Sequence, residues 1–380
     1  MQIDSRFEQI RVASECKRRE VAPVRPAPDA DACPIDPRKG LQKMRAPHDI
    51  LIFGGSGVAC MVRLLEGAAI ADAAPGKIVS MIDAARASGI RSSADMYVYT
   101  AGGTALDASM PPWAHDGGPE VMVSHLKDPA FRRKVIQAMR EVHPRNWENI
   151  YQQSSADGVL LLSVKGAALK PLIGKTIGQI AKARRVTPED AIVDLVIEDN
   201  ASAAAAYTFI SEDNIPKELA LPFVSSGSDA ESSAPEGVFL LSSTHPRAFG
   251  NFARIFAKYV RKEPVLTVEE AVRKLTSLPA DVLSIKDRGR LLVGDFADVV
   301  IFDPNTFQDH STYEKPQQYA TGVTDVIING KFALKDAQPT GISTGRIVRG
   351  RAWTGASGGG CRASSKDWTW INQPPRAPSP

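Results

Sequence analysis

The residues best suited to chemistry lie in two short runs. Gly227-Ser228-Asp229 follows a predicted strand, and His245-Pro246-Arg247 comes shortly after it. A carboxylate at a strand end is suited to general base and acid work, in which it takes a proton and returns it. Taken alone, the first run is more often a loop with a local Asx hydrogen bond, and Arg247 could equally be a surface ion-pair partner. The surrounding sequence has to decide between a catalytic site and these structural interpretations.

The residue types that bind metals are present, but they are not spaced as metal ligands. No two of the six histidines form a His-x-His pair, and the four cysteines form no Cys-x-x-Cys pair. The sequence therefore indicates neither a zinc site nor a disulfide framework, and the scattered cysteines favour a reducing, cytoplasmic setting. The histidines are His48, His115, His125, His143, His245 and His310.

Charge and hydropathy exclude several classes of partner. The chain has 380 residues, with 46 Lys and Arg against 43 Asp and Glu, and a formal net charge of +3. This excess is too small, and too interleaved with acids, to predict binding to nucleic acid or an anionic membrane. The N-terminus lacks the apolar core of a secretory signal, and Arg63 and Glu66 interrupt the most apolar early stretch. We expect one large domain and a smaller one, in a protein that neither binds nucleic acid nor enters a membrane.

The elements that must position these residues alternate between helix and strand. The strand Gly158–Val164 is apolar except for Ser163, as in strands buried on both faces of a parallel sheet. The alternation predicts a parallel α/β sheet with right-handed crossovers. In chain order, we predict helix Gly76–Ser88, strand Ile90–Thr100, helix Asp128–Val142, strand Gly158–Val164, a helix capped by Thr187, strands Tyr207–Ile210 and Phe223–Ser226, and a helix that opens with a capping box at Thr267–Glu270 and runs through Leu275.

The pattern changes after Arg290. Strands are predicted at Ala297–Phe302 and Asp325–Asn329, without a strong helix between them. Asn329-Gly330 and Lys335-Asp336 read as hairpin turns, the first much more strongly. A small antiparallel β unit is therefore expected here.

Three stretches together resemble one known family. They are the Gly227–Asp229 and His245–Gly250 pair, the run from Glu269 to Pro304 (EEAVRKLTSLPADVLSIKDRGRLLVGDFADVVIFDP), and the run from Val323 to Asp336 (VTDVIINGKFALKD). Their order is similar to that in the N-acyl-D-amino-acid deacylases, or D-aminoacylases, of the metal-dependent amidohydrolase superfamily. The segment DMYVYTAGGT resembles the family's D-x-Y-P-Y-T-A-G-S-T, with Val98 and Gly103 as departures.

The resemblance implies an α/β fold: a partial (β/α)₈ TIM-like amidohydrolase barrel with a small appended β-sandwich-type domain. His48–Gly55 resembles the family's opening β-strand, and the likeness then resumes only near Gly76. Much of the N-terminal half of the barrel is therefore expected to be missing. The expected divisions are a disordered leader (1–47), an N-terminal β-domain strand (48–58), the partial barrel (59–290), a C-terminal β domain (291–350) and a flexible tail (351–380).

The resemblance also implies roles for particular residues. Asp229 would take a proton from metal-bound water and pass it to the leaving nitrogen, and barrel enzymes carry such groups at strand ends. Arg247 would bind the carboxylate of an N-acyl-D-amino acid through a bidentate pair of hydrogen bonds. Tyr99 and Ser163 are expected to contact the substrate. Tyr97 stands where some relatives place a metal-ligating histidine, although it could be an ordinary strand aromatic.

The family uses zinc, but this sequence departs from its ligand pattern. The early His-x-His strand is absent, so we expect this chain to bind no stoichiometric zinc. Val123-Ser124-His125-Leu126-Lys127 imitates a metal-binding strand of the family but falls at the wrong place in the order. We therefore expect His125 to lie on a helix face or the surface.

Three functions remain open from the sequence. The leading one is an amide hydrolase of N-acyl-D-amino acids, impaired or inactive in this chain. The second is a cyclic amidohydrolase similar to dihydroorotase or hydantoinase, which the intact His245-Pro246-Arg247 run disfavours. The third is a non-catalytic remnant or scaffold. The sequence does not indicate an oligomeric state.

Overall fold

The computed structural model describes residues 58–61, 75–142 and 144–348. The expected leader, nearly all of the expected N-terminal β-strand and the expected tail lie outside the described residues. The strands are β1 (Val58–Met61), β2 (Ser92–Met96), β3 (Ala101–Ala105), β4 (Val159–Ser163), β5 (Ala204–Thr208), β6 (Val224–Ser226), β7 (Val299–Phe302), β8 (Val323–Ile328), β9 (Lys331–Lys335) and β10 (Gln338–Pro339).

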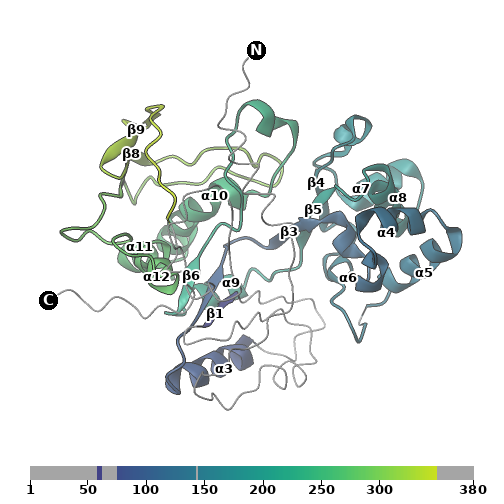
Figure 1. The fold of residues 1–380 in the computed structure, drawn as a ribbon, viewed down its shortest axis with the longest axis horizontal. Helices are drawn as coiled ribbons and strands as arrows, with labels where there is room; N and C mark the ends of the chain where they lie inside the picture. The colour runs from purple at the N-terminus through teal and green to yellow at the C-terminus, as the bar shows by residue number, and fades with distance from the viewer. Residues whose placement is uncertain (1–57, 62–74, 143, 349–380) are drawn as a thin grey trace, which may run out of the picture.

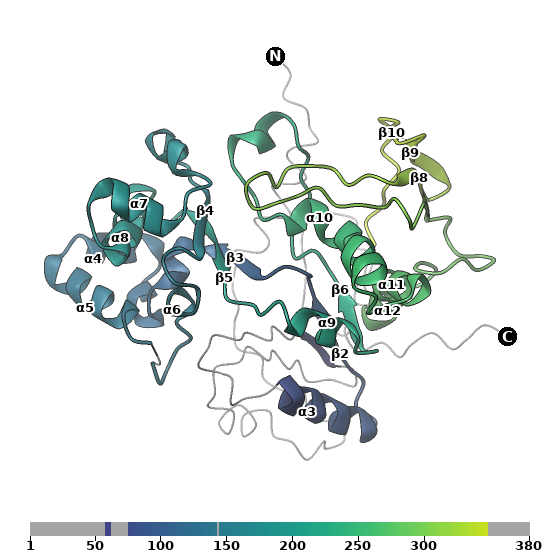
Figure 2. The same cartoon turned by 180° about the vertical axis from the view of Figure 1, so that it is seen from behind.

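The described residues form three separate sheets, and helices pack against two of them (Figures 1 and 2). The α-helices are α3 (Pro75–Ala87), α4 (Pro119–Leu126), α5 (Pro129–Met139), α6 (Ile150–Ser154), α7 (Ile177–Arg184), α8 (Pro188–Glu198), α9 (Asn214–Leu219), α10 (Arg247–Arg254), α11 (Val268–Leu275) and α12 (Ser277–Val282). Short 3₁₀-helices are η1 (Leu106–Ser109), η2 (Pro112–His115), η3 (Ala167–Leu172) and η4 (Gly237–Leu241), and η5 (Ile255–Lys262) is a π-helix.

A parallel sheet in the order β1-β2-β6 forms the centre of the molecule. Its carboxyl end carries the first candidate residues, because Tyr97 follows β2 and Asp229 follows β6. The Gly227 amide continues the ladder past β6 by donating to the Met96 carbonyl at 3.0 Å. The helices α9, η5 and α11 bury their apolar side chains against this sheet. The predicted α/β arrangement is thus present here.

A second unit, residues 101–210, lies at one end of the molecule (Figure 1). Its sheet has the order β3-β5-β4 and is antiparallel, and α4 to α8 pack around a core of their own. The strand predicted at Gly158–Val164 is β4, so its existence is confirmed but its parallel pairing is wrong. An apolar run shows that a strand is buried but does not show the direction of its neighbours. The single barrel expected over 59–290 therefore contains this additional unit.

The third sheet, antiparallel in the order β10-β9-β8-β7, forms the small β unit predicted after Arg290. Asn329 and Gly330 have φ of 51° and 78°, as in the mirror-image turns that join tight hairpins. The next turn is centred on Asp336 and Ala337, with φ of 49° and 61°, one residue later than predicted. Asp is among the few residues other than glycine that adopt the left-handed conformation readily, so Asp336 is tolerated here.

The predicted threonine caps are confirmed, but the Glu270 side chain of the expected capping box bonds to Arg273 instead. The hydroxyl of Thr187 accepts from the Asp190 amide, and that of Thr267 accepts from the Glu270 amide, at the starts of α8 and α11. In the described part of the chain, no helix is both long and apolar enough to span a membrane.

Candidate active site

Asp229 and Arg247 meet at the carboxyl end of the parallel sheet. Arg247 Nη2 lies 2.8 Å from Asp229 Oδ2 and also donates to the Asp229 carbonyl oxygen at 2.7 Å. Asp229 has a φ of 46°, a left-handed conformation in which the chain turns sharply after β6. The Asp229 side chain remains 36% exposed, whereas that of Arg247 is 7% exposed. The structure thus brings together the two residues that the sequence singled out.

The guanidinium of Arg247 keeps unused hydrogen-bonding capacity inside the protein. Its Cζ lies 4.4 Å from the centre of the Tyr97 ring, a cation–π contact that supports one face of the group. Nε and Nη1 are buried and have no hydrogen-bond partner in the described structure. A buried charged donor without an acceptor costs free energy, so such a group is suited to an incoming anion.

His245 holds the start of α10 in place. Its Nδ1 accepts from the Arg247 backbone amide at 3.0 Å, which leaves Nε2–H to donate to the Ala101 carbonyl at 2.8 Å. Burial, and then the charge of Arg247, lower the pKa of His245 to about 3. The imidazole is therefore neutral at physiological pH, and both of its nitrogens are engaged within the protein.

The two tyrosines after β2 make cation–π contacts with different arginines. Tyr97 lies under Arg247, whereas Tyr99 lies under Arg254, with 4.9 Å from Arg254 Cζ to the ring centre. The Tyr99 hydroxyl is buried without a hydrogen-bond partner, and burial raises its pKa. The structure therefore puts Tyr97, rather than Tyr99, beside Arg247. A substrate contact by Tyr99 stays a prediction.

Ser163 and His125 lie in the second unit. Ser163 ends β4, and that strand reaches the site through the Leu162 carbonyl, which accepts from the Ser243 amide at 2.9 Å, two residues before His245. His125 is exposed on α4. The helix-face position predicted for His125 is confirmed, and a substrate contact by Ser163 stays a prediction.

Three residues that sequence reasoning did not select also belong to the site. Asp95 accepts from the Ser225 hydroxyl at 2.8 Å; burial raises its carboxyl pKa, Ser225 opposes that rise and Asp229 adds to it. Asn251 bonds to both strand ends, and Tyr313 stacks edge-on against His245 at 5.3 Å. Asp95 stands in the quoted DMYVYT run, which was a usable signal. Nothing in spacing marks Asn251 or Tyr313.

The described residues do not fit the zinc that the resemblance implies. Zinc needs several histidine, cysteine or carboxylate ligands aimed at one point. Across 58–61, 75–142 and 144–348 there is no group of three or more His, Cys, Asp or Glu side chains that could hold a metal ion. His245 offers no nitrogen, and the cation of Arg247 covers the ring of Tyr97.

Comparisons with known proteins agree with the motifs. The family model described as "Amidohydrolase family" matches residues 224–333, from β6 into β9. The chain is 45% identical over 105 residues to N-acyl-D-glutamate deacylase of Alcaligenes xylosoxydans xylosoxydans, covering 28% of this chain and 21% of that protein. It is 32% identical over 177 residues to D-aminoacylase of the same organism, covering 47% and 34%.

The fold agrees as well. A D-aminoacylase of known structure, which has a binuclear metal centre, matches with a TM-score of 0.52 and 27% identity, covering 72% of this chain and 46% of that one. The predicted fold, part of an amidohydrolase barrel, is thereby confirmed. The chain spans less than half the length of each of these relatives.

Proposed function

We propose that this chain, which belongs to the D-aminoacylase family of amidohydrolases, acts on the amide bond of N-acyl-D-amino acids. The products would be a carboxylate and a free D-amino acid. A reducing, cytoplasmic setting suits this proposal, since the cysteines are scattered. The relatives' substrates motivate the choice of substrate class, and the site itself supports it in two ways.

The observation that carries the proposal is the buried, incompletely paired guanidinium of Arg247. An N-acyl-amino acid presents a carboxylate, and the Nε and Nη1 donors of Arg247 have no acceptor in the described structure. A carboxylate bound there would give an acceptor to a donor that is otherwise buried unpaired. Tyr97 below the guanidinium and His245 behind the Arg247 amide keep the group in one orientation. Arg247 thus binds and orients the substrate.

Asp229 supplies the proton-transfer group. Its carboxylate is partly exposed beside Arg247, so it can reach a water molecule and the amide nitrogen of a substrate whose carboxylate sits on Arg247. It takes a proton from the attacking water and returns it to the leaving nitrogen. Because the described residues do not fit a metal site, no step is assigned to zinc, and the activity of the chain is expected to be impaired.

The test is turnover of N-acyl-D-amino acids by the purified chain, with and without added zinc. Asp229→Asn should lower kcat by about 10²–10⁴-fold, because Asn keeps the shape but cannot accept the proton. Arg247→Lys should instead raise KM, because an ammonium cannot reproduce the guanidinium's paired donors. Matched controls are Asp303→Asn, in a turn of the third sheet, and Arg132→Lys, in the second unit.

The outcomes separate the candidate functions. Turnover that survives Asp229→Asn removes the proposed proton transfer. Turnover of cyclic amides but not of N-acyl-D-amino acids favours the dihydroorotase-like alternative. Absence of any turnover favours a non-catalytic scaffold.

A further inference from the structure

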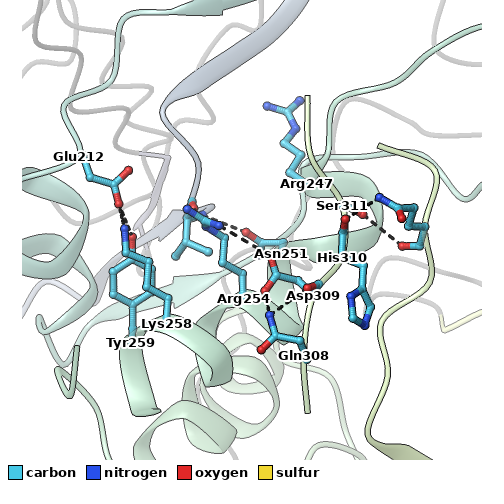
Figure 3. A network of polar contacts seen from close by, with 12 residues as sticks. Glu212, Arg247, Asn251, Arg254, Lys258, Tyr259, Gln308, Asp309, His310 and Ser311 are labelled. Carbon is cyan, nitrogen blue, oxygen red and sulfur yellow. Dashed lines mark hydrogen bonds and ion pairs between the residues drawn. The ribbon is translucent and has the colours of Figure 1, made fainter. Parts of the chain in front are cut away.

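Asn251 joins the two strand ends at the candidate site, and Figure 3 shows it in α10 together with Arg247 and Arg254. Its Nδ2 donates to the Gly227 carbonyl at 3.0 Å and to the Ser226 hydroxyl at 3.2 Å. Its Oδ1 accepts from the Val98 amide at 2.9 Å. Asn251 is 1% exposed, so these bonds form away from water. One amide thus uses both of its donor hydrogens on the end of β6 and its acceptor on the segment after β2.

These contacts lie next to the residues of the proposed mechanism. Val98 is the residue between Tyr97 and Tyr99, and Gly227 is two residues before Asp229. Asn251 is also four residues after Arg247 in α10, so the two side chains leave the helix on the same face. A single helix therefore presents Arg247 to the site and, one turn later, grips the backbone that carries Asp229.

The three hydrogen bonds of Asn251 require a side-chain amide, which offers two donor hydrogens and one acceptor oxygen. A carboxylate of the same shape keeps the acceptor for the Val98 amide but faces the Gly227 carbonyl with a negative oxygen. A leucine fills the space and offers neither donor nor acceptor, which leaves the Val98 amide and the Gly227 carbonyl unsatisfied in a buried place. Among side chains of this size, an amide alone bridges a backbone N–H on one side and a backbone carbonyl on the other.

We propose that Asn251 is a positioning residue, which sets the placement of Asp229 relative to Arg247 by clamping both strand ends to α10. This inference rests on the proposed function for the roles of Asp229 and Arg247. It goes beyond that function because it assigns to the buried amide of Asn251 the task of fixing the distance and orientation between Asp229 and Arg247. Small displacements of a catalytic group are costly in rate, so the clamp acts mainly on turnover.

The experiment compares Asn251→Asp and Asn251→Leu with a closely matched control, Asn149→Asp. Asn149 is also buried, at 3% exposed, donates to the Met139 and Glu141 carbonyls at 2.9 and 2.8 Å, and accepts from the Gln152 amide. It lies in the second unit, before α6. The control therefore loses the same kinds of bond far from the strand ends.

Amide hydrogen exchange of the full chain, read by mass spectrometry, gives the first result. In Asn251→Asp, exchange in the peptide around Gly227–Asp229 should accelerate about tenfold or more, while the peptide around Val98 stays protected. Asn251→Leu should accelerate exchange in both peptides, and Asn149→Asp should accelerate it in neither. Unchanged exchange at Gly227, or an equal acceleration throughout α10, η5 and α11, would overturn the clamp.

Steady-state kinetics on an N-acyl-D-amino acid give the second result. Asn251→Asp should lower kcat about tenfold or more and leave KM within about twofold, because His245 holds Arg247 separately. A rise in KM at constant kcat would contradict the assignment. A parent chain without turnover would reject the proposed function, and the exchange pattern would still decide whether Asn251 clamps the strand ends.

Discussion

Gly227 lies so close to Asp95 that a side chain added at Gly227 would force Asp95 to shift. A Cβ added at Gly227 would lie 2.7 Å from Asp95 Oδ2, a contact that the short, hydrogen-bonded Asp95 side chain cannot easily relieve. At Gly103, by contrast, an added Cβ would lie 3.6 Å from its nearest neighbour, Arg247 Nη2, which is ordinary contact. The two glycines therefore offer a matched comparison.

We expect Gly227→Ala to destabilise the fold by about 1–3 kcal/mol and to lower kcat, because the overpacked turn displaces Asp229. Gly103→Ala should change stability by less than about 0.5 kcal/mol. Chemical unfolding of both variants measures the difference. Equal stability of the two variants would show that the strand ends separate freely.

His245 predicts a dependence of stability on pH. Its pKa is lowered to about 3 in the folded protein, against 6.5 for an unperturbed histidine. Between these values the unfolded chain binds one proton more than the folded chain, so the stabilising contribution is present above pH 6.5 and is lost as the pH falls toward 3. The slope is about 1.4 kcal/mol for each pH unit in this window.

Thermal unfolding midpoints across this pH window, for the parent and for His245→Gln, measure the contribution. Other acidic groups titrate in both proteins, so the difference between the two curves isolates His245. We expect the two curves to converge as the pH falls from 6.5 toward 3. Parallel curves would contradict the neutral, bonded imidazole.

At the scale of single elements, Lys274 of α11 fixes the start of β6. The Lys274 side chain is 1% exposed, and its Nζ donates to the Leu221 carbonyl and, at 2.8 Å, to the Val224 carbonyl, with Glu270 at 3.7 Å. Burial lowers its pKa to about 8, partly offset by Glu270. The ammonium thus remains charged at neutral pH and ties a helix to the strand that leads to Asp229.

Lys274→Met should destabilise the protein by about 2–4 kcal/mol, because it leaves two carbonyl groups without donors. Lys258→Met, which removes a partly exposed ion pair with Glu212, should cost no more than about 1 kcal/mol. Urea unfolding followed by circular dichroism compares the two variants. Similar losses in both would show that the carbonyl groups find other partners.

Local signals predicted individual elements well and their pairing poorly. The hydroxyl caps at Thr187 and Thr267, and the Asn329-Gly330 turn, depend on neighbours within a few residues, so the sequence contains the whole cause. The antiparallel partner of Gly158–Val164 is β5, some forty residues away, and an apolar run carries no information about its direction.

The candidate site likewise contains some residues that the sequence could identify and others that only the fold reveals. Asp229 and Arg247 stood in short motifs and could be found before the fold was known. Asn251 and Tyr313 act through contacts made across long stretches of chain, with no distinctive residue type or spacing. Which tyrosine lies under Arg247 depends on how the segment after β2 turns, and this is a property of the packed structure.

At the scale of the whole molecule, the shortage of metal ligands predicts a low zinc content of the purified protein. We expect the purified chain to hold well below one zinc per chain, because the sequence has no His-x-His pair and the described residues contain no suitable ligand cluster. Elemental analysis after dialysis against a chelator-free buffer measures this. One tightly held zinc per chain would contradict it and would call for a ligand set outside the described residues.

The second unit enters and leaves the rest of the molecule at one point. Ala101 pairs with Thr208, and the Ile210 amide donates to the Thr100 carbonyl at 3.0 Å, so the two connecting segments run side by side. Such a segment can be inserted, deleted or exchanged during evolution without reopening the sheet behind it. A short linker from Thr100 to Ile210 would close the gap that removal of the unit leaves, provided that it offers His245 an acceptor in place of the Ala101 carbonyl.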